Sequence, residues 1–129
     1  MIKKSLAVLL CTLSLGAYSS TTTFPSTPIS VLNAVACPNA LPTDNAGFCP
    51  SFKSVATCYC TSSGLPPGMC NDMTALYNRL VSVFGSLKKA CDYQKYTTPQ
   101  DCMDNWNCYL SGGVDSRGRL CSGTKKACQ

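Results

Sequence analysis

The sequence predicts an all-α fold, a small disulfide-stapled helical bundle of about four to five helices. Eleven of the 129 residues are cysteines, a density typical of small secreted proteins held together by disulfides. Several segments carry apolar residues at intervals of three and four, which indicates helices, whereas the alternating pattern of strands is absent. No internal repeat is present, and the length fits a single folded domain.

The N-terminal 19 residues are predicted to be a secretory signal peptide. Lys3 and Lys4 precede an apolar run over residues 6–15, the order in which these features occur in signal peptides. A membrane-spanning helix needs roughly 20 apolar residues, about twice the length of this run, so no transmembrane anchor is expected. The cleavage position stays open between Ala17 and Ser19.

Residues 20–36 are predicted to form a leader rich in Ser, Thr and Pro, which has too little apolar surface to order itself. Within this leader, Thr27 could cap a short helix that begins at Pro28. The rest of the chain, residues 37–129, is expected to be one disulfide-rich helical domain.

Two helices are expected in the first half of that domain. In the first, aromatic and aliphatic residues recur at helical intervals from Phe48 to Tyr59, with Pro50 near the start and Ser62-Ser63-Gly64 at the end. The second is expected to be one amphipathic helix of about six turns from Met69 to Cys91. Its internal Gly85 costs about 1 kcal/mol relative to alanine, so another element is expected to approach closely there.

The third helix has the clearest start and stop signals in the sequence. Thr98 can cap it, and Pro99 stands at the first helical position. It should run to about Leu110, because Gly112 follows shortly afterwards. After a turn, a last short helix is expected over residues 120–128, with its two cysteines on one face.

Ten cysteines follow the signal peptide, an even number that permits five disulfides. They are Cys37, Cys49, Cys58, Cys60, Cys70, Cys91, Cys102, Cys108, Cys121 and Cys128. No pair has the C-x-x-C spacing of redox motifs and zinc ribbons, and the chain has no histidine, so disulfides are preferred over metal ligation and redox catalysis. No cofactor is expected. Antiparallel packing of the second and third helices would join Cys91 to Cys102; the other pairings stay open.

The side chains that most enzymes use are scarce. Histidine and glutamate are absent, and every acid is one of six aspartates. No G-x-S-x-G motif is present, and no base is available to activate a hydroxyl. Asp101 and Asp104 could form a carboxylate pair for glycoside hydrolysis, but their place in the first turns of a helix already accounts for them. No catalytic residue is predicted.

Two stretches resemble secreted phospholipase A2. Residues 57–64 look like the calcium loop of that family, and residues 101–109 look like its D-x-C-C-x-x-H-D-x-C-Y helix. In this register, however, Asn105 falls where the catalytic histidine should be, and Trp106 falls where the calcium-binding aspartate should be. Because no other histidine can substitute, we expect neither phospholipase activity nor a metal site.

The basic residues suggest a binding surface. Loss of Lys3 and Lys4 leaves nine basic residues against six aspartates, a side-chain charge of +3, which favours anionic surfaces but is too small for a nucleic-acid binder. The candidate binding residues are Arg117, Arg119, Lys125 and Lys126 near the C-terminus, Lys88, Lys89 and Lys95 around the end of the second helix, and Trp106. If the cations converge, they suit the phosphates of anionic lipids or phosphoinositides.

Two functions are therefore considered. The first is a secreted, non-enzymatic effector that docks on an anionic membrane or a phosphoinositide through the basic residues. The second is a protein-binding module, an inhibitor or a receptor ligand, that uses long proline-containing loops and an aromatic surface formed by Tyr93, Tyr96, Trp106 and Tyr109. In its layout of signal peptide, disulfides and small helical body, the chain resembles cysteine-rich proteins of the bacterial type II secretion route, which implies folding in the periplasm before release outside the cell.

Overall fold

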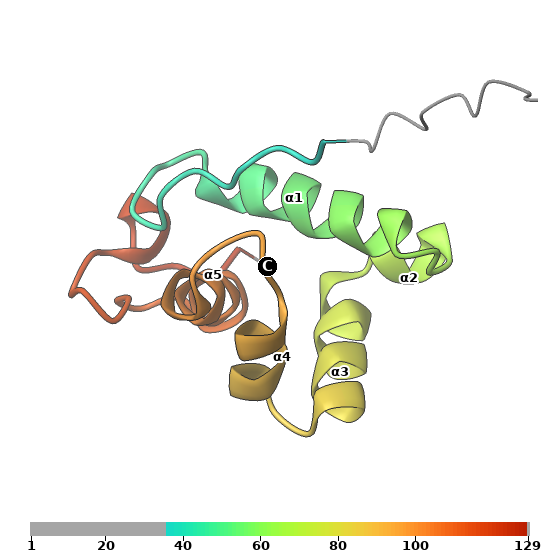
Figure 1. Ribbon diagram of the computed structural model, residues 1–129. Helices are drawn as coiled ribbons and strands as arrows, with labels where there is room; N and C mark the ends of the chain where they lie inside the picture. The colour runs from blue at the N-terminus through green and yellow to red at the C-terminus, as the bar shows by residue number, and fades with distance from the viewer. Residues whose placement is uncertain (1–35, 129) are drawn as a thin grey trace, which may run out of the picture. The chain divides into compact units, whose positions relative to one another are not determined.

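Helices make up the regular structure, and the predicted all-α, disulfide-stapled class is confirmed. The computed structural model describes residues 36–128, which belong to one unit of the chain, Asn33–Gln129. Within these residues, no strand forms beyond one isolated bridge between Val114 and Leu120. The helices are α1 (Phe48–Ser62), α2 (Pro67–Cys70), α3 (Met73–Phe84), α4 (Leu87–Tyr93), α5 (Pro99–Ser111) and the short 3-10 helix η1 (Cys121–Gly123) (Figure 1).

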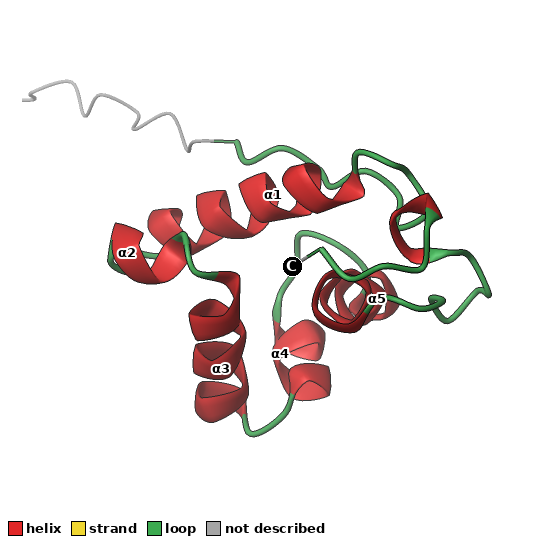
Figure 2. Cartoon of the chain, turned by 180° about the vertical axis from the view of Figure 1, so that it is seen from behind, coloured by secondary structure: helices red, strands yellow, loops and turns green. Residues whose placement is uncertain are grey.

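The segment that leads into α1 runs back alongside that helix (Figure 2). The disulfide between Cys37 and Cys58 ties the start of this segment to α1. The predicted signal peptide and almost all of the predicted leader, with its helix at Thr27, lie outside the described residues. No helix within residues 36–128 has the length and hydropathy of a membrane span.

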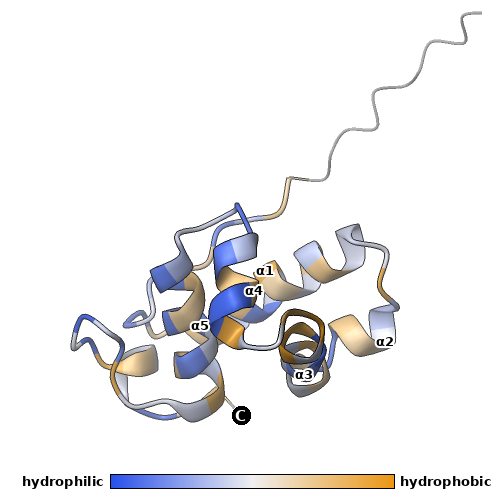
Figure 3. Cartoon of the chain, turned by 60° about the horizontal axis from the view of Figure 1, so that its bottom comes forward, coloured by the Kyte–Doolittle hydropathy of each residue, from blue (hydrophilic) through white to orange (hydrophobic). Residues whose placement is uncertain are grey.

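The core lies between α1, α3 and α5. Phe52 of α1 packs edge-on against Trp106 of α5, with ring centroids 5.1 Å apart, and against Tyr109 at 5.6 Å. Met73 and Leu76 of α3 are buried in the same cluster. Figure 3 shows α3 orange along one side and blue along the other, as expected of a helix that buries one face.

The prediction of one long helix from Met69 to Cys91 is wrong, because capping residues divide it into three. Asp72 accepts a hydrogen bond from the backbone N–H of Ala75 at 2.9 Å and begins α3. Gly85 ends α3 in the left-handed conformation, with φ of +83°. Ser86 accepts a hydrogen bond from the N–H of Lys89 at 3.2 Å and begins α4. Local capping therefore interrupts an apolar stripe that continues through both breaks.

The close approach expected at Gly85 is also wrong. A Cβ atom at this position would meet only the Lys89 Nζ atom, 4.0 Å away. The glycine serves the turn between α3 and α4, which lie antiparallel to each other (Figure 1), since a left-handed residue at the end of a helix is most often glycine.

Replacing Gly85 with alanine is expected to lower the free energy of unfolding by about 1 kcal/mol, because alanine is strained at a positive φ. Gly68→Ala is the matched control, since a Cβ atom at Gly68 meets nothing within 4 Å and the backbone φ there is not positive. The control should be neutral or slightly stabilising. Urea unfolding of the oxidised proteins measures both values, and equal stability of the two variants would contradict this account of the turn.

The predicted first and third helices are confirmed. Helix α5 begins as expected, because the Thr98 hydroxyl accepts a hydrogen bond from the N–H of Asp101 at 3.1 Å and Pro99 follows the cap. It ends at Gly112, whose φ is +68°. A Cβ atom there would overlap the backbone of Lys125 and Ala127, so the C-terminal segment lies directly against this glycine.

Five disulfides fasten the helices to one another. They join Cys37 to Cys58, Cys49 to Cys128, Cys60 to Cys70, Cys91 to Cys102, and Cys108 to Cys121. The predicted bond between Cys91 and Cys102 is confirmed, and it holds α4 against α5. Five bonds in one small domain indicate folding in an oxidising compartment, and each typically adds about 2 to 4 kcal/mol of stability.

The last helix predicted over residues 120–128 is wrong. Only η1 forms there, and Ser122 and Lys125 have positive φ angles of 54° and 64°, which a continuous helix cannot contain. The two cysteines of this segment do not share a face as expected, because Cys121 bonds to α5 and Cys128 bonds to α1. The two disulfides hold the segment in an irregular path between those helices.

Candidate functional site

A buried carboxylate organises the loop that follows α5. Asp115 accepts hydrogen bonds from the backbone N–H groups of Arg117 and Arg119, both at 2.9 Å, and closes the turn. It also accepts from the Thr43 hydroxyl at 2.6 Å and from Arg119 Nε at 2.7 Å. Burial by itself would raise the pKa of Asp115, but these hydrogen bonds from Thr43, Arg119 and Arg117 lower that pKa to about 2. Asp115 is therefore ionised and joins the loop to the segment before α1.

Arg119 is occupied by this structural role. Besides Asp115, its guanidinium donates to the Thr43 hydroxyl at 3.0 Å and lies 3.6 Å from the Asp44 carboxylate. With all of these partners, Arg119 has little capacity left for a phosphate group. Its predicted role in binding an anion is correspondingly weak.

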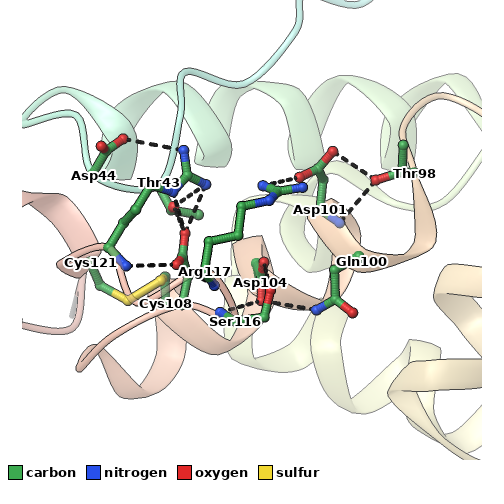
Figure 4. Close-up of polar contacts among 12 residues, drawn as sticks. Thr43, Asp44, Thr98, Gln100, Asp101, Asp104, Cys108, Ser116, Arg117 and Cys121 are labelled. Atoms are coloured by element: carbon green, nitrogen blue, oxygen red, sulfur yellow. Dashed lines mark hydrogen bonds and ion pairs between the residues drawn. A yellow bond between two sulfur atoms is a disulfide. The ribbon is translucent and has the colours of Figure 1, made fainter.

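Arg117 is less constrained. One nitrogen of its guanidinium lies 2.7 Å from the Asp101 carboxylate, and both side chains are partly exposed (Figure 4). The hydroxyl of Thr98 donates to the same carboxylate at 2.7 Å. The hydrogen bond from Thr98, followed by that from Arg117, lowers the pKa of Asp101.

The pair of carboxylates considered for glycoside hydrolysis has structural partners. Asp104 is buried, and it accepts hydrogen bonds from the hydroxyl and the N–H of Ser116 at 2.6 and 3.1 Å (Figure 4). Gln100 donates to it at 3.2 Å. Asp101, as described above, pairs with Arg117. Each carboxylate thus fixes the loop after α5 in place.

A cavity of about 300 Å³ opens beside Arg117 and Arg119. Its lining comes from the segment before α1, from α1, from the loop between α4 and α5, from α5 and from the loop after α5. The lining residues are Pro38, Asn39, Ala40, Leu41, Pro42, Thr43, Phe52, Val55, Tyr96, Thr97, Asp101, Asn105, Arg117 and Arg119. No local pattern in the sequence indicates this cavity, because its lining residues are up to 81 positions apart in the chain.

Trp106, predicted as a binding residue, lies in the core. Only 2% of its surface is exposed, and it contacts Phe52 and Tyr77. Tyr109 is buried beside it. Neither ring can anchor a partner at the surface, so only Tyr93 and Tyr96 remain of the predicted aromatic surface.

An exposed aromatic contact joins Phe84, at the turn between α3 and α4, to Tyr93, the last residue of α4. Tyr93 is 71% exposed, and its ring packs against Phe84 with centroids 5.0 Å apart. Val83, beside Phe84, is 56% exposed. This turn projects away from α1 at the bottom of Figure 1. Large apolar side chains that are exposed on neighbouring helices often mark an interaction surface.

Basic residues occur on the same two helices as these apolar groups and directly after α4. Lys88 pairs with Asp92 at 2.7 Å, and Lys95 donates to the Asp92 carbonyl at 3.4 Å. Lys89 lies one helical turn before Tyr93, and Arg79 lies one turn before Val83, so each pair shares a helix face. We call this surface the α3–α4 corner; it consists of Arg79, Val83, Phe84, Lys88, Lys89, Asp92, Tyr93 and Lys95.

The positive charge of the described residues is concentrated at the α3–α4 corner. Four of their nine basic residues lie there with one of the six aspartates, and the other five basic residues are matched by the other five aspartates. The corner therefore carries the whole excess of +3. Asp72 caps the start of α3, the end of that helix away from the turn to α4.

The predicted cations occupy three places. Lys88, Lys89 and Lys95 belong to the α3–α4 corner. Arg117 and Arg119 line the cavity, where each pairs with aspartate. The exposed Lys125 and Lys126 lie in the C-terminal segment beside Gly112 and Gly113, and the N–H of Gly113 donates to the Lys125 carbonyl at 2.7 Å. Arg79, Val83 and Phe84 were not predicted as binding residues, because the apolar pattern predicted one continuous helix through them.

Comparison with protein-family models, with curated proteins and with solved structures finds no match for this chain.

Proposed function

We propose that this protein is a secreted, non-enzymatic binding protein that docks on anionic membrane surfaces through the α3–α4 corner. The observation that carries the proposal is that the excess positive charge and the exposed apolar side chains belong to the same pair of helices, α3 and α4, and to the residues next to them. Export by the type II route, which the layout of the sequence resembles, belongs to the same proposal.

The electrostatics of the corner suit a negatively charged bilayer. A lysine or arginine near an anionic membrane surface contributes about 1 kcal/mol to binding. Lys88, Lys89 and Lys95 are all exposed, so their chains can reach lipid phosphates without rearrangement of the helices. The single carboxylate of the corner, Asp92, is already paired with Lys88.

The apolar side chains of the corner add a second contribution. Tyrosine favours the boundary between headgroups and hydrocarbon, where the ring is buried and the hydroxyl stays hydrated. Tyr93 and Val83 are both exposed, so each can enter the membrane surface while the core remains intact. A protein partner with an acidic surface is the competing function, and the experiment below separates the two.

Replacing Lys88, Lys89 and Lys95 with glutamine is expected to weaken binding to phosphatidylserine-containing liposomes between about tenfold and 100-fold. Co-sedimentation of the oxidised protein, purified after export, measures this effect, with neutral phosphatidylcholine and phosphoinositide-containing liposomes as further arms. Binding should also fall as the salt concentration rises, because the attraction is electrostatic.

The matched control changes Lys53, Lys125 and Lys126 to glutamine. It removes the same charge from exposed positions outside the corner and should retain most of the binding. An equal loss of liposome binding in both variants would show that the attraction does not depend on the α3–α4 corner. If the unmodified protein binds no liposome, the membrane function is excluded and the acidic protein partner is the remaining function.

A further inference from the structure

The cavity beside Arg117 shares no residue with the α3–α4 corner and takes no part in the proposed membrane contact. Its volume of about 300 Å³ is at the lower end of the range for small-molecule sites. The chemistry of its walls indicates which class of ligand it suits.

One side of the cavity is apolar and held in place. Phe52 and Val55 of α1 are buried core residues that reach the cavity. Tyr96 lines it from the loop between α4 and α5, and its ring stacks on Tyr59 with centroids 4.0 Å apart. Burial, and then the neighbouring Tyr59, raises the pKa of Tyr96, so its hydroxyl remains a donor.

The other side of the cavity offers planar polar groups. Asp101 and Asn105 lie one turn apart on α5 and therefore share a helix face. Arg117 reaches across from the loop after α5 to Asp101 (Figure 4). Within residues 36–128, no hydrogen bond occupies the side-chain amide of Asn105, the hydroxyl of Thr97 or the remaining N–H groups of the Arg117 guanidinium. These donors and acceptors stay available to a ligand.

The charges of the cavity are balanced. Arg117 is paired with Asp101, and Arg119 is paired with Asp115 and lies near Asp44. An anionic ligand would have to compete with these carboxylates, and a cationic ligand would have to compete with the arginines. A neutral ligand that both donates and accepts hydrogen bonds, and that also presents apolar surface, meets neither penalty.

We propose that this cavity binds a neutral saccharide. Each sugar hydroxyl donates and accepts hydrogen bonds, which matches the mixed groups of Asp101, Asn105, Thr97 and Arg117. The C–H faces of a sugar ring can pack on Val55 and on the rim formed by Tyr96. A planar amide or guanidinium can also contact two neighbouring hydroxyls at once, which gives orientation as well as affinity.

Titration of the 15N-labelled, oxidised protein tests this inference by the shifts of its amide resonances. The probes are the methyl glycosides of glucose, galactose, mannose and N-acetylglucosamine, with inorganic phosphate and acetate as anionic probes. At least one glycoside should cause saturable shifts at Val55, Thr97 and Asn105. Asn105→Ala should weaken that binding about tenfold.

Asn107→Ala is the matched control, since Asn107 is exposed on the same helix and does not line the cavity. It should bind as the unmodified protein does. Three results would overturn the inference. The first is saturable shifts at the cavity with phosphate or acetate alone, and the second is no response to any glycoside. The third is that Asn105→Ala and Asn107→Ala weaken glycoside binding equally. Because no lipid is present, the result is independent of membrane docking.

Discussion

Asp115→Asn is expected to lower the free energy of unfolding by about 3 to 5 kcal/mol, the cost of breaking a buried, hydrogen-bonded ion pair by removing one partner. The carboxylate accepts from Thr43, from two backbone N–H groups and from the Arg119 guanidinium. An amide keeps the shape but loses the charge, and its NH2 group meets donors. Urea unfolding followed by the fluorescence of the single tryptophan, Trp106, measures the change.

Asp44→Asn provides the control for that experiment. Asp44 is exposed, and its contact with Arg119 is longer, at 3.6 Å. Exposed ion pairs contribute about 0 to 1 kcal/mol, so this variant should be nearly as stable as the unmodified protein. If Asp115→Asn cost no more than Asp44→Asn, the network around Asp115 would not hold the loop after α5.

The same carboxylate predicts how stability depends on pH. The pKa of Asp115 is lowered from 3.8 to about 2 in the folded protein. Its contribution is therefore fully present above pH 3.8 and is lost as the pH falls towards 2, and the shift corresponds to about 2 to 3 kcal/mol. Urea titrations of the unmodified protein should show this loss in the free energy of unfolding as the pH falls from about 3.8 to about 2. The Asp115→Asn variant should not show it, because it has no carboxylate to protonate at this position.

Removing the disulfide between Cys49 and Cys128 is expected to cost about 4 kcal/mol. The bond spans a sequence separation of 79 residues, and the entropy lost by the unfolded chain grows with the length of the closed loop. The variant with both cysteines changed to serine should therefore unfold at a clearly lower urea concentration than the unmodified protein.

The bond between Cys60 and Cys70 supplies the comparison for that variant. It spans a separation of only 10 residues, and its replacement by two serines should cost about 2 to 3 kcal/mol by the same relation. A larger loss for this short loop than for the long one would show that local packing, and not chain entropy, decides the contribution of these bonds.

Local signals in the sequence were sufficient for α1 and α5 and insufficient for α3 and α4. The start of α5 depends on Thr98 and Pro99, which act within one turn. The apolar stripe of α3 and α4 continues across Gly85, so periodicity alone predicted one helix. The capping side chains of Asp72 and Ser86 were visible in the sequence, but only the structure shows that they outweigh the stripe.

The candidate sites could not be predicted in full, because they are built from contacts between residues that lie far apart in the sequence. Thr43 and Asp115 are 72 positions apart, and nothing near either residue indicates the other. The burial of Trp106 follows from the face of α5 that meets α1, which the sequence did not specify. Lys88, Lys89 and Lys95 were predicted as binding residues because charge can be read directly from the sequence, whereas the exposure of Val83 depends on where α3 ends.

The long bond between Cys49 and Cys128 also imposes an order on oxidation. A chain that enters an oxidising compartment from its N-terminal side presents Cys49 together with Cys58 and Cys60, while the correct partner of Cys49 follows 79 positions later. During that interval Cys49 must remain reduced, or an early bond to a nearer cysteine must be exchanged. Three of the other bonds lie wholly inside this loop. We therefore expect the yield of native protein to depend on a thiol–disulfide isomerase at the place where it folds.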